Sequence, residues 1–144
     1  MLVQQILKSK ADDGVVTIAP GTTLADAAQL LSQRKIGAVV VSPDGKRVAG
    51  ILSERDIVRE LAAQGAGCLA VTVDTVMTTA IVTCGRSDGS DNVLEMMTKG
   101  RFRHLPVVEG DEMIGLISIG DVVKAQLSEL AMEKEALEGM IKGF

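Results

Sequence analysis

An internal repeat constrains the fold of this chain more than any other feature of its sequence. "KIGAVVV" (35–41) matches "RFRHLPV" (101–107) at an offset of 66, and "GILSERDIV" (50–58) matches "GLISIGDVV" (115–123) at an offset of 65. The one-residue slip falls between them, in "SPDGKR" and "EGDE", where Gly and Asp favour tight turns and length variation is tolerated. Repeats at such spacing decide the architecture, so we expect two copies of one folding unit.

Each copy shows the same order of elements, β-α-β-β-α. Short strands are predicted at 15–18 and 80–83, and paired strands joined by a turn at 37–41 with 47–53 and at 104–108 with 113–118. An amphipathic helix follows the first strand of each copy, because apolar residues recur there at helical spacing: Leu24, Ala27, Leu30 and Leu31, then Val93, Leu94, Met96 and Met97. A second helix closes each copy.

The helix starts carry capping residues. Thr23 with Asp26 predicts a capping box for the first helix, and Ser87 or Asp88 is the expected cap in the second copy. The sequence therefore predicts an α/β (α+β) fold in which two β-α-β-β-α repeats pack about a pseudo-two-fold axis. The predicted parts are an N-terminal segment (1–14), repeat 1 (15–64), a linker (65–79), repeat 2 (80–127) and a C-terminal helical extension (128–144).

Composition narrows the function. The net charge of −4 and pI near 5.0 disfavour nucleic-acid binding, which normally needs a basic face. No apolar run approaches the roughly 20 residues that cross a bilayer, and "MLVQQILKSK" lacks the pattern of a secretion signal, so we expect a cytoplasmic protein without a membrane segment. Two cysteines without metal-type spacing and a single histidine predict no metal site and no catalytic residues.

The strands that end at residues 53 and 118 both lead into the pattern S-x-x-D. Ser53 with Asp56 and Ser118 with Asp121 occupy equivalent positions in the two copies. One interpretation is structural, because Ser and Asp at this spacing cap the free N–H groups of a helix. The other is functional, because a carboxylate accepts hydrogen bonds from both hydroxyls of a ribose and a helix N-terminus favours phosphate. Both interpretations stay open from the residues alone.

With these motifs the chain resembles a tandem pair of CBS domains, also called a Bateman module, from about Val15 to Leu127. "TVMTTAIVT", "RKIGAVVV", "RFRHLPVVE", "GILSERDIV" and "GLISIGDVV" carry the resemblance. It implies a regulatory module that binds an adenosine-containing ligand between its repeats, with AMP as first candidate and ATP, ADP, NAD(H) or S-adenosylmethionine as others. It implies that the closing Asp of each repeat binds the ribose hydroxyls and the preceding Ser the ribose or phosphate.

The resemblance extends to further candidate positions. It implies an adenine slot around Val16 in the first repeat and around Thr75, Ala80 and Val82 in the second, and phosphate contacts from Lys35 and Arg101. Arg55, Arg103 and His104 are additional candidates. The alternative for Arg55 is a solvated helix face, and for His104 a structural hydrogen bond.

The resulting hypothesis is a nucleotide sensor, not an enzyme, that needs no obligatory cofactor and modulates an unidentified protein partner. The alternative is a constitutive assembly module whose clefts are vestigial; a phosphate-processing enzyme is disfavoured by the lack of a P-loop or metal cluster in the sequence. In the C-terminal segment Val123, Leu130 and Leu137 fall seven apart, as do Leu127, Lys134 and Ile141. This spacing is typical of a coiled-coil seam and, with the resemblance, predicts a homodimer.

Overall fold

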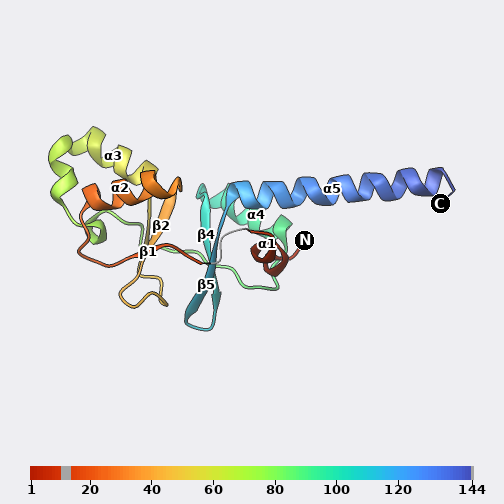
Figure 1. Cartoon of the computed structure of the whole chain (residues 1–144), viewed down its shortest axis with the longest axis horizontal. Helices are drawn as coiled ribbons and strands as arrows, with labels where there is room; N and C mark the ends of the chain where they lie inside the picture. Colours follow the sequence, from red (N-terminus) through yellow and green to blue (C-terminus); the bar gives the residue numbers. More distant parts are fainter. Residues whose placement is uncertain (11–13, 144) are drawn as a thin grey trace. The chain divides into compact units, whose positions relative to one another are not determined.

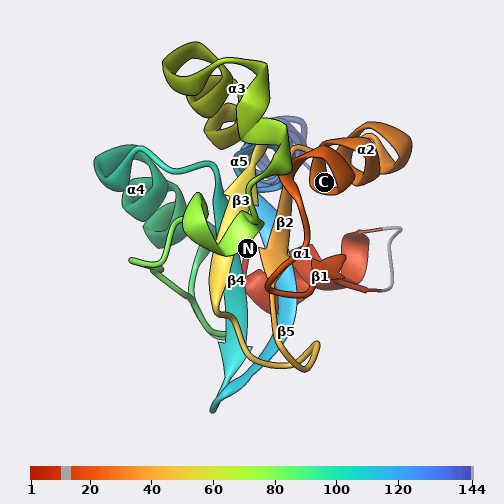
Figure 2. The same cartoon turned by 90° about the vertical axis from the view of Figure 1, so that its left-hand side faces the viewer.

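The computed structural model describes residues 1–10 and 14–143, and these divide into two compact units (Figures 1 and 2). The helices and strands are, in chain order, α1 (Val3–Ser9), β1 (Thr17–Ile18), α2 (Leu24–Arg34), β2 (Ala38–Val41), β3 (Gly50–Ser53), α3 (Glu54–Gln64), α4 (Ser90–Gly100), β4 (His104–Glu109), β5 (Glu112–Ser118) and α5 (Ile119–Ile141). Two short 3-10 helices, η1 (Ala66–Ala70) and η2 (Val73–Thr75), lie between α3 and α4.

One unit contains Gly14–Val82 and the hairpin tip Val108–Ile114. Its sheet has the order β1-β2-β3, with β1 parallel and β3 antiparallel to β2. All four residues of β2 are buried, which explains why "AVVV" is a continuous apolar run without alternation. Helices α2 and α3 pack on this sheet around one core, formed by Leu24, Ala27, Leu31, Val39, Val41, Leu52, Ile57, Cys68 and Val73.

The other unit contains the remaining described residues, namely 1–10, 83–107 and 115–143. It is built from β4 and β5 with helices α1, α4 and α5, and α5 contacts both other helices. Its most buried apolar residues are Val3, Ile6, Val93, Met97, Leu105, Val107, Ile117 and Val122. The predicted helices and paired strands of both copies are therefore present.

The strand predicted at 80–83 does not form. A single parallel bridge between Cys84 and Val107 stands in its place, with the Cys84 N–H donating to the Pro106 carbonyl at 3.0 Å. In the first copy the Val40 N–H donates to the Val16 carbonyl at 3.3 Å, and Pro106 occupies the position equivalent to Val40. Because proline has no N–H, the matching rung of the second ladder is lost, and Val82 is 44% exposed.

The caps of the first helices also differ between the copies. Thr23 caps α2 as predicted, since its hydroxyl accepts the Asp26 N–H at 3.2 Å. In the second copy the cap is Gly89, not Ser87 or Asp88, and the Asp88 carboxylate accepts the Gly85 N–H at 2.7 Å instead. Asp88 therefore stabilises the preceding turn, and no side chain caps the start of α4.

Residues 1–10 pack as an integral part of their unit, and the 3-10 helix η2 does the same in the other unit. The Val3 N–H donates to the Asp88 carbonyl at 2.9 Å, and the Val73 N–H donates to the Thr22 carbonyl at 2.7 Å. The side chains of Val3 and Val73 are both fully buried. Thus the segment preceding repeat 1 completes repeat 2, and the segment between the repeats completes repeat 1.

Candidate functional site

Both S-x-x-D motifs form reciprocal capping boxes. The Ser53 Oγ accepts the Asp56 N–H at 3.3 Å, and the Asp56 Oδ2 accepts the Ser53 N–H at 2.9 Å. In the second copy the Ser118 Oγ accepts the Asp121 N–H at 3.1 Å, and the Asp121 Oδ2 accepts the Ser118 N–H at 2.9 Å. The structural interpretation of the motif is therefore correct for both copies, whatever further role the carboxylates have.

The strands hold these helix starts in place. Helices α3 and α5 follow β3 and β5 without a loop, so each Ser is the last residue of a strand and the cap of a helix. The first N–H of each helix is bound by the residue just before the partner strand, β2 or β4: Glu54 donates to the Gly37 carbonyl at 2.9 Å, and Ile119 to the Arg103 carbonyl at 2.8 Å. Each carboxylate thus lies in a helix first turn, where the N–H groups carry partial positive charge.

The two carboxylates have different cationic partners. Asp56 is 6% exposed, and its Oδ1 lies 3.2 Å from the Arg59 Nη1, on the same helix and largely in solvent. Asp121 is more accessible, and its Oδ2 lies 3.0 Å from the Lys10 Nζ, which comes from the other end of the chain. Lys10 also donates to the Leu116 carbonyl at 2.7 Å. Only Asp121 is therefore bound by a residue that is distant in sequence.

The charge state of Asp121 follows from these contacts. Burial of the carboxyl raises its pKa, but the hydrogen bond from the Ser118 N–H and the ammonium of Lys10 together outweigh it. The net result is a pKa below the usual value for Asp. Asp121 is therefore an acceptor at neutral pH, as a role in binding hydroxyl donors requires.

A pocket of about 530 Å³ opens beside Asp121, within one unit. It is lined by Met1, Ile6, Ser9, Lys10, Asp121, Lys124, Ala125 and Ser128. Such a volume is within the range of small-molecule pockets, which hold a few polar groups on apolar walls. The carboxylate gives this pocket an acceptor for hydroxyls, and Lys124 gives it a cation for an anion.

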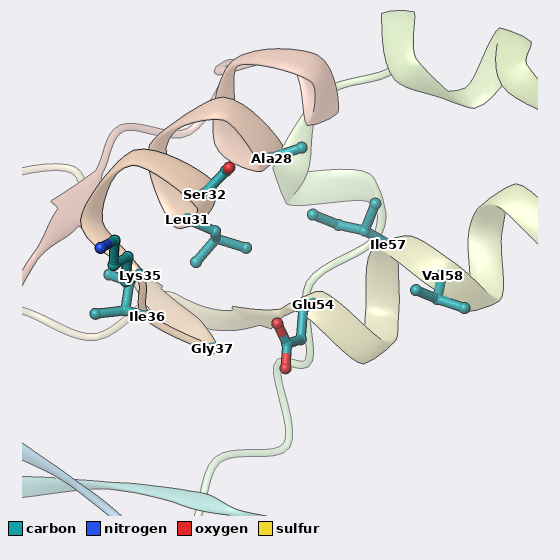
Figure 3. A pocket seen from close by; sticks show the side chains of 9 residues that line it. All are labelled: Ala28, Leu31, Ser32, Lys35, Ile36, Gly37, Glu54, Ile57 and Val58. Carbon is teal, nitrogen blue, oxygen red and sulfur yellow. The ribbon is translucent and has the colours of Figure 1, made fainter.

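A second pocket of about 520 Å³ lies between α2 and α3 in the other unit (Figure 3). Its lining is mainly apolar, with Lys35 and Glu54 as its only charged residues, and Asp56 does not line it. Lys35 therefore lines a pocket to which Asp56 does not contribute.

The remaining candidates lie mostly on the surface. Lys35 and Arg101 end α2 and α4 in the left-handed conformation, with φ of 55° and 56°, so their equivalent positions reflect helix termination. The Thr75 hydroxyl donates to the Thr72 carbonyl at 2.7 Å. Arg55, Thr75, Ala80, Val82 and Arg103 are exposed, whereas Val16 and His104 are half-buried. Lys10, which contacts Asp121 directly, is the residue that the sequence reasoning missed.

The part of the chain that the structure describes shows neither a metal-binding cluster nor a membrane-spanning helix. No group of three or more His, Cys, Asp or Glu side chains there is placed to hold a metal ion. Nor is any helix among residues 1–10 and 14–143 both long and apolar enough to cross a bilayer.

The comparison with protein families gives an independent result on the repeats. The family model "CBS domain" matches the chain twice, over residues 5–63 and 73–128. The chain belongs to the CBS-domain family. The two matched stretches include both S-x-x-D motifs, and proteins of this kind act as regulatory modules.

Relatives and solved structures agree with this assignment. The chain is 33% identical to the Arabidopsis thaliana protein CBSX3, mitochondrial, covering 98% of this chain and 72% of the relative. It is 31% identical to YhcV of Bacillus subtilis, covering 79% and 80%. Among structures, the CBS-domain protein ATU1752 from Agrobacterium tumefaciens matches with 44% identity and a TM-score of 0.83, covering 88% of this chain and 99% of its own.

A more distant structure is informative for its ligands. The CBS domain pair of protein MJ0100 has the same fold, with 22% identity and a TM-score of 0.78 over 90% of this chain and 98% of its own. That pair was solved in complex with 5′-methylthioadenosine and S-adenosyl-L-methionine.

Proposed function

We propose that this CBS domain pair binds an adenosine-containing ligand at Asp56 and Asp121 and thereby regulates a protein partner. The observation that carries the proposal is the occurrence of the same Ser-capped carboxylate at the same helix start in both repeats. The adenosine compounds bound by the MJ0100 pair support the ligand class. AMP is the first candidate, with ATP, ADP, NAD(H) and S-adenosylmethionine as the others.

The chemistry of the motif suits this ligand class. An ionised carboxylate offers two oxygens that accept hydrogen bonds from the vicinal hydroxyls of a ribose. The helix N-terminus, with hydroxyls of Ser53 and Ser118 at its cap, favours a phosphate nearby. The exposed positions of Arg55, Lys35, Arg101 and Arg103 leave them available for phosphate, while Val16, Thr75, Ala80, Val82 and His104 are proposed to contact the base. No step of this function requires catalysis or an obligatory cofactor.

Thermal melting with separate additions of AMP, ATP, NADH and S-adenosylmethionine tests the proposal. A ligand that binds only the folded state stabilises it by about 2.7 kcal/mol at 100 times its Kd, so the melting temperature should rise for the true ligand class. The alternative, a constitutive assembly module with vestigial clefts, predicts unchanged melting with all four compounds.

The proposed partner surface includes the exposed stripe of α5, which we propose to pair with a second copy of the chain. Leu127, Leu130 and Leu137 are 62%, 61% and 60% exposed, although apolar side chains at seven-residue spacing normally pack in a seam. From residue 130 to residue 143 every described residue except Gly139 is exposed. Nothing within the described chain covers this stripe.

The charges on α5 favour an antiparallel arrangement of two copies. In a parallel, in-register pair each Lys134 would face its own counterpart in the seam, where the two like charges repel each other. An antiparallel pair can adopt a register that sets Lys134 against Leu130 of the second copy and brings Lys124 near Glu138. Antiparallel pairing therefore removes a repulsion and adds opposite-charge contacts at the rim.

Replacing Leu130 by Asp should dissociate this dimer, because a buried seam does not tolerate an unpaired carboxylate. Sedimentation equilibrium at high micromolar concentration should show wild type as a dimer and Leu130→Asp as a monomer. Met132→Asp is the matched control, since Met132 is 59% exposed on α5 but lies off the seven-residue stripe. A monomeric wild type would contradict the proposed interface.

The cytoplasm is the compartment that we propose for this function. Cys68 and Cys84 are both unpaired and buried, as is common in reducing compartments. The Arabidopsis thaliana relative CBSX3, in contrast, is mitochondrial.

A further inference from the structure

Lys10 is a point at which the two repeats differ in chemistry. The segment "VQQIL" (3–7) at the start of the chain is matched 70 residues later by "VDTVM" (73–77). Both segments pack alike: the backbone of Leu2 bridges to Gly89, and the backbone of Thr72 bridges to Thr23. At the same offset, Lys10 is matched by Ala80, which has no charge.

Two polar contacts fix the position of the Lys10 ammonium. Its ammonium lies 3.0 Å from the Asp121 Oδ2 and 2.7 Å from the Leu116 carbonyl oxygen, and its side chain is only 29% exposed. The Asp121 Oδ2 also accepts the Ser118 N–H at 2.9 Å. Since one carboxylate oxygen has two lone pairs, this oxygen has no capacity left for a ligand hydroxyl.

Asp56 is held from within its own helix start, since its Oδ2 accepts both the Ser53 N–H at 2.9 Å and the Ser53 hydroxyl at 3.1 Å. Its cationic partner, Arg59, is 69% exposed and belongs to the same helix. An ion pair with so exposed a partner contributes little free energy, so a ligand displaces it cheaply. The residue equivalent to Arg59 is Lys124, which lines the pocket beside Asp121. The two repeats therefore present the same carboxylate with different cations: Asp56 has one from its own helix, and Asp121 has one from residues 1–10.

We infer that Lys10 is a built-in competitor for the ligand at Asp121. The ammonium takes an acceptor position on the Asp121 Oδ2, and a ribose hydroxyl binds that oxygen only when Lys10 leaves it. At Asp56 the cation is the exposed Arg59 of the same helix, so no residue distant in sequence competes there. This inference rests on the proposed function and adds to it a control of the Asp121 site by residues 1–10.

Calorimetric titration of the full chain with AMP tests the inference. Lys10→Met keeps the length and apolar stem of the side chain but removes the ammonium. Affinity at the Asp121 site should rise about tenfold, because a charge-assisted hydrogen bond no longer has to be broken. Lys8→Met is the matched control: Lys8 is exposed on α1, and the same substitution there should leave AMP affinity unchanged. The double variant Lys10→Met with Asp121→Ala should lose the gain.

The outcomes separate this inference from the function on which it rests. If Asp121→Ala weakens AMP binding but Lys10→Met leaves it unchanged, Lys10 is not a competitor and the inference fails alone. If Lys10→Met weakens binding, Lys10 contacts the ligand and the inference is again wrong. If neither wild type nor any variant binds AMP, the nucleotide function fails together with the inference. Should Lys10→Met not fold, Lys10→Gln carries the same expectations.

Discussion

Replacing both Asp56 and Asp121 by Ala should lower nucleotide affinity by roughly ten- to a hundredfold at each site. Hydrogen bonds to a charged group contribute about 1.5–3 kcal/mol, and each ~1.4 kcal/mol corresponds to a tenfold change in Kd. Each carboxylate is held at its helix start by a Ser N–H at 2.9 Å, so it is already oriented before a ligand arrives. Calorimetry on the two single variants and the double variant measures the loss site by site.

The structure changes how this experiment is controlled. Because both carboxylates also complete capping boxes, either substitution should cost about 1 kcal/mol of stability, whether or not a ligand binds there. Lowered melting therefore does not separate the structural from the functional interpretation. Thr23→Ala provides the control, since it removes the cap of α2, which carries neither carboxylate, and should lower stability by a similar amount with unchanged affinity. Unchanged ligand affinity in the double Asp variant would show that the motifs are caps alone.

Ile6→Ala should have the largest effect on stability, about 2–5 kcal/mol of the free energy of unfolding, as for other large buried side chains cut to Ala. Ile6 is 2% exposed on a helix of only seven residues, and Leu7 on the same helix packs closely against Gly115 of β5. A cavity at Ile6 therefore weakens the attachment of residues 1–10 to β5 and α5. Urea denaturation followed by circular dichroism measures the loss.

The control for this experiment is Leu2→Ala, four residues earlier. Leu2 is 37% exposed, so the same kind of truncation should cost less than about 1 kcal/mol. Equal stability of the two variants would mean that the N-terminal residues are a loose tail. A large loss for Ile6→Ala alone would establish them as part of the second repeat, together with the lysine that reaches Asp121.

Much of the candidate site could be predicted from sequence because it is local. A Ser and an Asp three residues apart make their reciprocal hydrogen bonds within one helical turn, so the motif at 53–56 and at 118–121 needs no distant partner. The same holds for the amphipathic helices and the paired strands, whose periodicity is set by the backbone itself. The strand predicted at 80–83 failed to form because of its pairing partner. Pro106 has no N–H, so it cannot make the backbone hydrogen bond that Val40 makes in the first copy.

The sequence by itself determined the two repeats, their helices and hairpins, and the paired carboxylates, since each is written in spacings of a few residues. Only the tertiary structure decided which repeat the N-terminal segment completes and what stands beside Asp121. Lys10 and Asp121 are 111 residues apart, and no periodicity relates them. Their contact exists because burial of Val3 and Ile6 seats α1 on the second repeat. That packing depends on hydrophobic burial between residues that are distant in sequence, and local spacing does not encode it.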